Sequence, residues 1–195
     1  MQKILESVPN FSEGRDSKKL EKIAACFRGH QGIKLLDYSG DYDHNRSVFT
    51  IIGEPEAVVA ALLDVIGLAI DLIDLNQHQG QHPYIGAVDV IPLIPIQGMD
   101  MTEADQYAKS LAEKAADKYG LPSYLYEKSA SSPQRENLAD IRRGQYGNLS
   151  EKMQDAAWQP DFGPSYPHPT AGCTAIGARL PLIAFNVCLN TDDLE

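Results

Sequence analysis

The sequence predicts an α+β domain with a ferredoxin-like βαββαβ core, extended to a mixed sheet with helices mainly on one face. Three observations predict this fold. Short β-branched runs and helical spacing of apolar residues follow one another in the order β-α-β-β-α-β. The second helical stretch is strongly apolar, and its acidic residues fall on one face, as expected of a helix packed against a sheet. The chain has 195 residues, 43% of them hydrophobic and 23% charged, which is enough for one domain with a substantial core.

The first half of the chain supplies the six elements of this core. Strands are expected at residues 3–8, 33–38, 47–52 and 88–96, and helices at residues 17–29 and 55–75. Asp16 or Ser17 can cap the first helix, and Gly29 ends it. Pro92 and Pro95 interrupt the fourth strand, and because proline cannot donate to a ladder they predict an edge strand or a bulge.

The second half of the chain extends the sheet. Thr102 and Asp105 resemble a capping box that opens a third helix, which Gly120 closes. Two further strands are expected at residues 123–126 and 182–189, separated by a polar, loop-rich stretch at 129–172 that holds one or two short helices.

Charge and cysteine content exclude several classes of protein. A net charge of −10 disfavours general binding to nucleic acid, whose phosphates would be repelled. The cysteines at 26, 173 and 188 form no C-x-x-C pair, so neither a disulfide framework nor a structural zinc site is indicated. Aspartates interrupt the apolar stretch at 57–75, which argues against a membrane span, and without a signal peptide we expect a cytoplasmic protein.

Two polar segments follow strand ends in the first half of the chain. Residues 8–14, VPNFSEG, crowd polar side chains into a loop at a strand end, although an ordinary helix-entry loop explains them as well. Residues 37–46 form a polar hairpin tip of the kind that turn-forming residues favour. Arg46, at the start of the next strand, could form paired hydrogen bonds with a carboxylate.

A third segment, residues 76–89, carries two histidines. His78 and His82 are four residues apart, which on a helix would place both on one face and allow metal binding. Gly80 and Pro83 argue against a helix, so a metal site is the minority interpretation. A histidine in a glycine-flanked loop before a strand suits a general acid–base, and a plain surface loop accounts for it equally well.

A fourth segment, residues 158–179, is rich in proline, glycine and aromatic residues. Such a loop can line a pocket for a flat heterocycle by offering rings and backbone N–H groups. A long connection between strands is the alternative.

Taken together, these segments resemble the formiminotransferase family, whose motifs occur in the same order over nearly the whole chain. The matching pieces are VPNFSEG at 8–14, LLD and NRSVFT within 35–50, HQGQHPYIGAVDVIPLIPI at 78–96, YLYE at 124–127, PDFGP at 160–164 and LIAFNV at 182–187. The resemblance implies that residues 1–180 form the N-terminal subdomain of the family's domain. Residues 181–195 would then hold its last strand and the start of a connection to a second subdomain.

The resemblance also implies an activity and a set of site residues. The activity is transfer of a formimino group from N-formimino-L-glutamate to tetrahydrofolate as co-substrate, in a homodimer or in a chain paired with the second subdomain. The family's catalytic acid–base histidine corresponds to His82. Its folate-binding stretch corresponds to Gly163, Pro164, Ser165, Tyr166, Pro167, His168, Pro169, Thr170, Ala171 and Gly172. Candidate supporting residues are Asn10, Glu13, Asp41, Asn45, Arg46 and Asp89.

Each supporting residue has an expected role. Glu13 or Asp89 would orient the imidazole, and Arg46 would bind a substrate carboxylate. Asn10 and Asn45 would donate hydrogen bonds. The chain departs from the family where Ser39 stands in place of an aspartate, for which Asp41 is a possible substitute, and residues 167–170 also differ.

Three other functions remain open from the sequence. A folate enzyme that takes a formyl instead of a formimino group could use the same histidine and pocket. A non-catalytic folate-binding or interaction module is a second alternative, since the fold itself sets no function. A metal-dependent hydrolase built on His78, His82 and Asp89 is the third.

Overall fold

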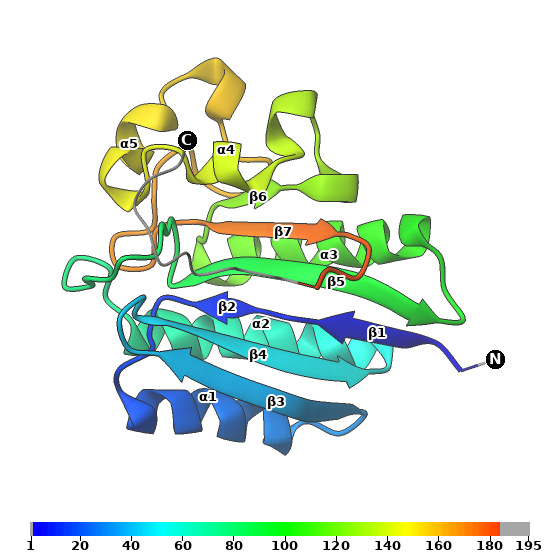
Figure 1. Cartoon of the computed structure of the whole chain (residues 1–195). Helices are drawn as coiled ribbons and strands as arrows, with labels where there is room; N and C mark the ends of the chain where they lie inside the picture. The colour runs from blue at the N-terminus through cyan, green and yellow to red at the C-terminus, as the bar shows by residue number, and fades with distance from the viewer. Residues whose placement is uncertain (1, 184–195) are drawn as a thin grey trace, which may run out of the picture.

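A mixed seven-stranded sheet forms the centre of the protein in the computed structural model, which describes residues 2–183 (Figure 1). The strands are β1 (Ile4–Ser7), β2 (Asn10–Phe11), β3 (Ile33–Asp41), β4 (Arg46–Gly53), β5 (Val88–Gln97), β6 (Ser123–Leu125) and β7 (Thr174–Ala178). β4 and β5 each pair antiparallel with both β1 and β2, so β1 and β2 act as one interrupted strand. β3 flanks β4, while β7 and then β6 extend the sheet from β5 by parallel pairing. This order confirms the predicted ferredoxin-like core and its extension to a mixed sheet.

Three long helices cover one face of the sheet (Figure 1). They are α1 (Ser17–Gly29), α2 (Pro55–Leu72) and α3 (Met101–Tyr119). Their apolar faces and the facing strand residues form the main core, in which Phe49 meets Phe11 edge-on at 5.2 Å between ring centroids. None of the helices in residues 2–183 is long and apolar enough to cross a membrane.

A second, smaller core lies on the other face of β5, β7 and β6, where it is covered by the chain from 127 to 158, which folds into short helical turns that include α4 (Leu138–Arg142) and α5 (Leu149–Lys152). Ile141 and Leu149 in these turns belong to one buried cluster with Val90 of β5 and Tyr124 of β6. The polar, loop-rich region expected at 129–172 is therefore packed against the sheet, and this packing fixes the position of α4.

The helix ends follow local chemistry. Asp16 caps α1, as predicted, by accepting hydrogen bonds from the N–H groups of Lys18 and Lys19. For α3 the predicted capping box at Thr102 is wrong, because Asp100 caps the helix instead by accepting from the N–H of Glu103. Gly120 ends α3 in the left-handed conformation, with φ 62°.

The prediction that the strand with two prolines lies at an edge is wrong, whereas the alternative of a bulge is confirmed. β5 pairs on both sides, with β1 and β2 on one and β7 on the other. The last pair of β5 with β1 is Leu93 opposite Ser7, and its first pair with β2 is Val90 opposite Asn10. Residues 91 and 92 between these pairs face the gap between the two short strands. Pro92 thus faces the interruption between β1 and β2, where the antiparallel ladder needs no N–H donor.

Residues 174–178 form β7, although the sequence analysis assigned them to a loop. All five residues are buried, and they lie between β5 and β6. A strand buried on both faces has no apolar–polar alternation to reveal it. Gly177 is needed for close packing, because a Cβ there would lie 2.2 Å from the carbonyl oxygen of Tyr126. The strand predicted at 182–189 lies outside the described residues, apart from Leu182 and Ile183, which form no strand.

Candidate functional site

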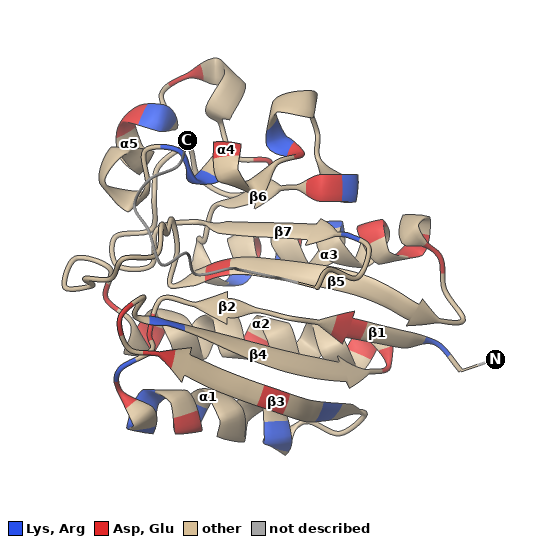
Figure 2. Ribbon diagram, viewed as in Figure 1, with Lys and Arg blue, Asp and Glu red and all other residues tan. Residues whose placement is uncertain are grey.

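Three loops meet at one end of the sheet. They follow β2, join β3 to β4, and precede β5. Because β2 runs antiparallel to both β4 and β5, the end of β2 lies beside the starts of the other two strands. Arg46 begins β4 and Asp89 is the second residue of β5. Figure 2 shows basic and acidic segments gathered at this end of the sheet. Residues from the first three segments selected from the sequence therefore converge in space.

Asn45 holds the three loops together. Its side-chain oxygen accepts the N–H of Gly14 at 2.9 Å, and its amide nitrogen donates to the carbonyl of Gln79 at 2.9 Å and lies 3.3 Å from Nδ1 of His78. The residue has a φ of 48°, a conformation that asparagine tolerates better than most residues. The amide of Asn45, which was predicted to donate a hydrogen bond to substrate, therefore bonds to other loops of the protein instead.

His82 lies half-buried in this loop cluster, and within residues 2–183 no side chain hydrogen-bonds to its ring. Burial lowers the pKa of His82 to about 4, assisted by the positive charges of Arg46 and Arg142. The carboxylate of Asp89 opposes this effect. The ring is therefore neutral at pH 7 and can accept a proton there.

Asp89 occupies a buried position that a β-bulge creates. Val90 faces Asn10 and Val88 faces Phe11, so Asp89 is the extra residue of β5 in its pairing with β2. One of its carboxylate oxygens accepts the N–H of Ile85 at 2.8 Å, which fixes the turn between His82 and β5.

The other oxygen of Asp89 pairs with Arg142. It accepts from Nε of Arg142 at 2.9 Å and from a terminal guanidinium nitrogen of the same side chain. The exposed fractions of the two side chains are 3% and 14%, so this is a buried ion pair. Arg142 was missed in the sequence analysis, because a single arginine 53 residues away on a five-residue helix carries no local signal.

Arg46 contributes a half-buried guanidinium beside His82. The two carboxylates that act on its charge, those of Asp89 and Asp41, form ion pairs with Arg142 and His44 instead. Its Nε is buried and has no hydrogen-bond partner among the described residues. The guanidinium charge therefore lacks an ion-pair partner among the described residues, and an anionic ligand group in the adjoining depression would be stabilised.

Glu13 and Asn10 are engaged elsewhere and make no hydrogen bond to His82. Glu13 accepts the N–H groups of Arg15 and Asp16, each at 3.0 Å, and pairs with Lys19 at 2.9 Å, which organises the start of α1. Burial acts to raise the pKa of Glu13, but these hydrogen bonds lower it overall.

Asn10 is 5% exposed and donates to the carbonyl of Val8 at 2.8 Å. Its side-chain oxygen is buried without a partner in the described chain. The side chain of Asn10 therefore has a free hydrogen-bond acceptor, its amide oxygen, and not the free donor that was predicted.

The predicted folate-binding segment, Gly163–Gly172, runs beside the histidine loop. The carbonyl of Thr170 accepts the N–H of Leu75 at 2.8 Å, and that of Ala171 accepts the N–H of Ala87 at 3.0 Å. These bonds join its second half to both ends of the loop that carries His78 and His82. Nδ1 of His168 accepts the N–H of Ala171 at 3.1 Å, so this ring shapes the segment itself.

No metal site emerges from the histidines. Within residues 2–183, no group of three or more His, Cys, Asp and Glu side chains converges closely enough to hold a metal ion. Nδ1 of His78 faces the amide of Asn45, and Asp89 is committed to Arg142.

Comparison with known proteins gives a consistent match over the chain. Residues 4–179 match the family model described as "Formiminotransferase domain, N-terminal subdomain". The chain is 44% identical over 195 residues to the glutamate formimidoyltransferase of Streptococcus pyogenes serotype M1 and 41% identical over 194 residues to that of Thermoplasma acidophilum. It is 42% identical over 189 residues to the formimidoyltransferase-cyclodeaminase of Mus musculus. These matches cover 100%, 98% and 97% of the chain, but 65%, 64% and 35% of the respective relatives.

Proposed function

The chain belongs to the formiminotransferase family, and from this premise we propose that its protein transfers the formimino group of N-formimino-L-glutamate to N5 of tetrahydrofolate. The products would be 5-formimidoyltetrahydrofolate and L-glutamate. The single observation that best supports the proposal is His82, an imidazole that is neutral at pH 7 and lies at the end of the sheet where the three loops meet.

The reaction has a proton requirement that this histidine meets. N5 attacks the amidine carbon to form a tetrahedral intermediate and must lose its proton. An imidazole that is neutral at pH 7 can take that proton. The bond from the carbon to the glutamate nitrogen then breaks, and this nitrogen must leave as a protonated amine.

Arg46 is the proposed anchor for a carboxylate of the glutamate moiety. Its guanidinium forms no ion pair with a carboxylate of the described residues, and its side chain lines the same depression as His82. A carboxylate bound there would also offset one of the charges that hold the pKa of His82 low. Arg46→Ala should raise KM for the glutamate donor at least tenfold with little change in KM for the folate; an unchanged donor KM would exclude this anchor.

We place the folate beside the histidine loop, along Gly163–Gly172. This position is supported by the hydrogen bonds that join residues 170 and 171 to both ends of that loop. Substitutions there should change KM for tetrahydrofolate more than KM for the glutamate donor.

The function is tested by following formation of the formimino-folate product with the purified protein. His82→Ala should lower kcat by about 10²- to 10⁴-fold, the usual contribution of a general acid–base. His30→Ala is the control, because His30 lies at the end of α1 beside Asp64. A loss below threefold in His82→Ala would remove this residue from the role.

The same assay separates the alternative functions. Faster transfer from a formyl donor than from formiminoglutamate would favour the formyl-transferring enzyme. Tetrahydrofolate binding without transfer from either donor would favour a non-catalytic binding module.

A further inference from the structure

The turn between β3 and β4 carries a histidine–carboxylate pair that faces the site. Nδ1 of His44 lies 2.9 Å from one carboxylate oxygen of Asp41, and the backbone N–H of His44 donates to the other oxygen at 2.9 Å. These bonds, the backbone one first, lower the pKa of Asp41, so its carboxylate is ionised at neutral pH. The pair fixes the ring in one orientation and leaves Nε2 of His44 free for another partner.

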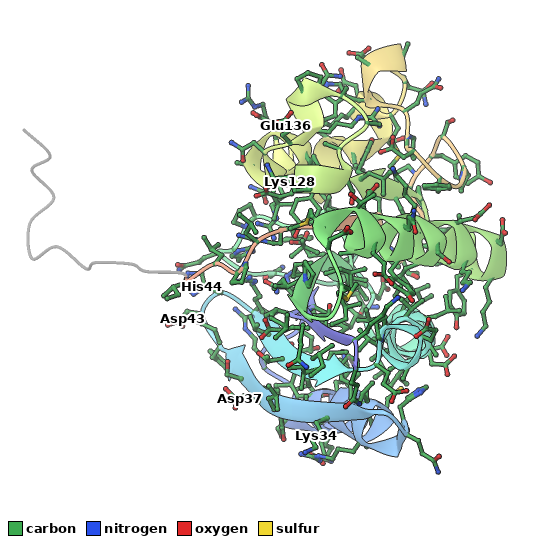
Figure 3. All side chains as sticks on the ribbon, turned by 90° about the vertical axis from the view of Figure 1, so that its right-hand side faces the viewer. Lys34, Asp37, Asp43, His44, Lys128 and Glu136 are labelled. Atoms are coloured by element: carbon green, nitrogen blue, oxygen red, sulfur yellow. The ribbon has the colours of Figure 1, made fainter. Side chains whose placement is uncertain are left out.

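The ring of His44 lies next to that of His82. The ring centroids are 6.4 Å apart and the planes are inclined at 66°. Both rings line one depression on the sheet, together with Arg46 and Ser39. Figure 3 shows His44 on the side of the sheet away from the long helices.

The distance between the two rings is held by contacts between their loops. The N–H of Gln81 donates to the carbonyl of Asp43 at 3.3 Å. Gly80 approaches so closely that a Cβ there would lie 2.3 Å from the carbonyl oxygen of His44. The turn and the histidine loop therefore form one unit.

The charged and titratable groups that face His44 come from three elements. They are Asp41 at the end of β3, Arg46 at the start of β4 and His82 in the loop before β5. Arg15 reaches the same turn from the start of α1, where its Nε donates to the carbonyl of Tyr42 at 2.8 Å. The one carboxylate that contacts the His44 ring in the described residues is that of Asp41.

We propose that His44, oriented by Asp41, is a second catalytic residue that protonates the departing glutamate nitrogen while His82 accepts the proton of N5. This role rests on the proposed function. A bond forms between N5 and the formimino carbon, and the bond between that carbon and the glutamate nitrogen breaks. The N5 proton moves to His82, and an imidazolium proton of His44 moves to the leaving nitrogen. The cycle closes when His82 releases a proton and the solvent-accessible His44 takes one up.

Two separate groups suit this reaction better than one. The attacking and leaving nitrogens are bonded to the same carbon, and the two rings line one depression with their centroids 6.4 Å apart, so a substrate lying in that depression can present one nitrogen to each ring. The pKa of His82, lowered to about 4 by burial and by Arg46 and Arg142, leaves its ring unprotonated at neutral pH, so His82 has no proton to give to the leaving amine. The leaving amine is basic, and it requires a proton donor that is already protonated before the bond breaks.

The test measures kcat against pH for His44→Gln, Asp41→Asn and His30→Gln. His30 is a matched control, since its Nε2 also faces a carboxylate, that of Asp64 at 3.4 Å. His44→Gln should lower kcat by about 10²- to 10⁴-fold, change KM for either substrate less than threefold, and abolish the fall of kcat at alkaline pH. Asp41→Asn should move that fall to lower pH, and it serves as the test if His44→Gln does not fold by near-UV circular dichroism.

Each outcome decides between the proposals. A kcat within twofold of the unsubstituted protein, or a lower kcat with an unchanged alkaline limb, would overturn the role of His44. If activity is lost in His82→Ala but retained in His44→Gln, the proposed function stands and His44 is excluded. Absence of transfer in the unsubstituted protein would refute the proposed function, and this role with it.

Discussion

Replacing Arg142 with methionine tests whether the buried pair with Asp89 holds the site in place. Methionine keeps an unbranched side chain of similar reach but removes the charge. The carboxylate of Asp89 would keep the N–H of Ile85 and lose both bonds from the guanidinium. The exposed fraction of the Asp89 side chain is 3%, so water cannot replace those bonds without local opening.

The expected cost follows from this burial. Removing one partner of a buried ion pair typically destabilises a protein by about 3–5 kcal/mol, because the other charge stays buried and unpaired. A domain of this size has a free energy of unfolding of about 5–15 kcal/mol, so Arg142→Met should lose a large part of it. Asp89→Asn in the same chain removes the unpaired charge, so the double variant should regain about 2 kcal/mol relative to additivity.

Urea denaturation of the two single variants and the double variant measures this coupling. Arg143→Met is the matched control, because the adjacent Arg143 pairs with Asp140 at the surface and its side chain is 80% exposed. Exposed pairs contribute about 0–1 kcal/mol, so the control should remain near the stability of the unsubstituted protein. Equal losses in Arg142→Met and Arg143→Met, or a coupling below about 0.5 kcal/mol, would refute the reasoning.

Three further predictions concern the loops and the pH dependence. Gly172→Ala should cost about 2–4 kcal/mol in urea denaturation, because φ is 67° and a Cβ would lie 2.1 Å from a carbonyl oxygen, whereas Gly147→Ala, with open space around it, should be near neutral. Asn45→Ala should cost about 2–3 kcal/mol and raise the hydrogen-exchange rate of the histidine loop, since it removes hydrogen bonds to two other loops. The folded-state pKa of His82, about 4, lies below its ordinary value of 6.5, so the unfolded chain takes up the proton first and stability falls as the pH drops from 6.5 towards 4. Between pH 7 and pH 5 the free energy of unfolding should therefore fall by about 1 kcal/mol more in the unsubstituted protein than in His82→Ala, after allowance for the partial exposure of the ring. Equal decreases in the two proteins would contradict the lowered pKa.

Local rules accounted for most of the fold. The cap at Asp16 and the left-handed Gly120 depend on interactions within a few residues, and both were readable in the sequence. β7 was not readable, because a strand buried on both faces has no alternation and this one lies in a glycine-rich stretch. The position of β5 was misjudged, since whether a proline fits an inner strand depends on where the partner strand is interrupted.

The site was readable only in part. His82 was selected through the family resemblance and Arg46 from its residue type and its position at a strand start, and the structure brings them together with Asp89 and Asn45. Their catalytic and binding roles, like the homodimer and the second subdomain, stay predictions. Glu13 was expected to orient the imidazole, but the structure commits its oxygens to the start of α1.

The sequence by itself determined the order of the elements of the ferredoxin-like core, and with it the family, because periodicity, capping residues and ordered motifs are properties of neighbouring residues. Only the tertiary structure decided which charges meet. Arg142 reaches Asp89 across 53 residues, and His44 faces His82 because two loops interlock at one end of the sheet. Ion pairs and pKa values depend on distance and burial, and no local pattern in the chain encodes either quantity.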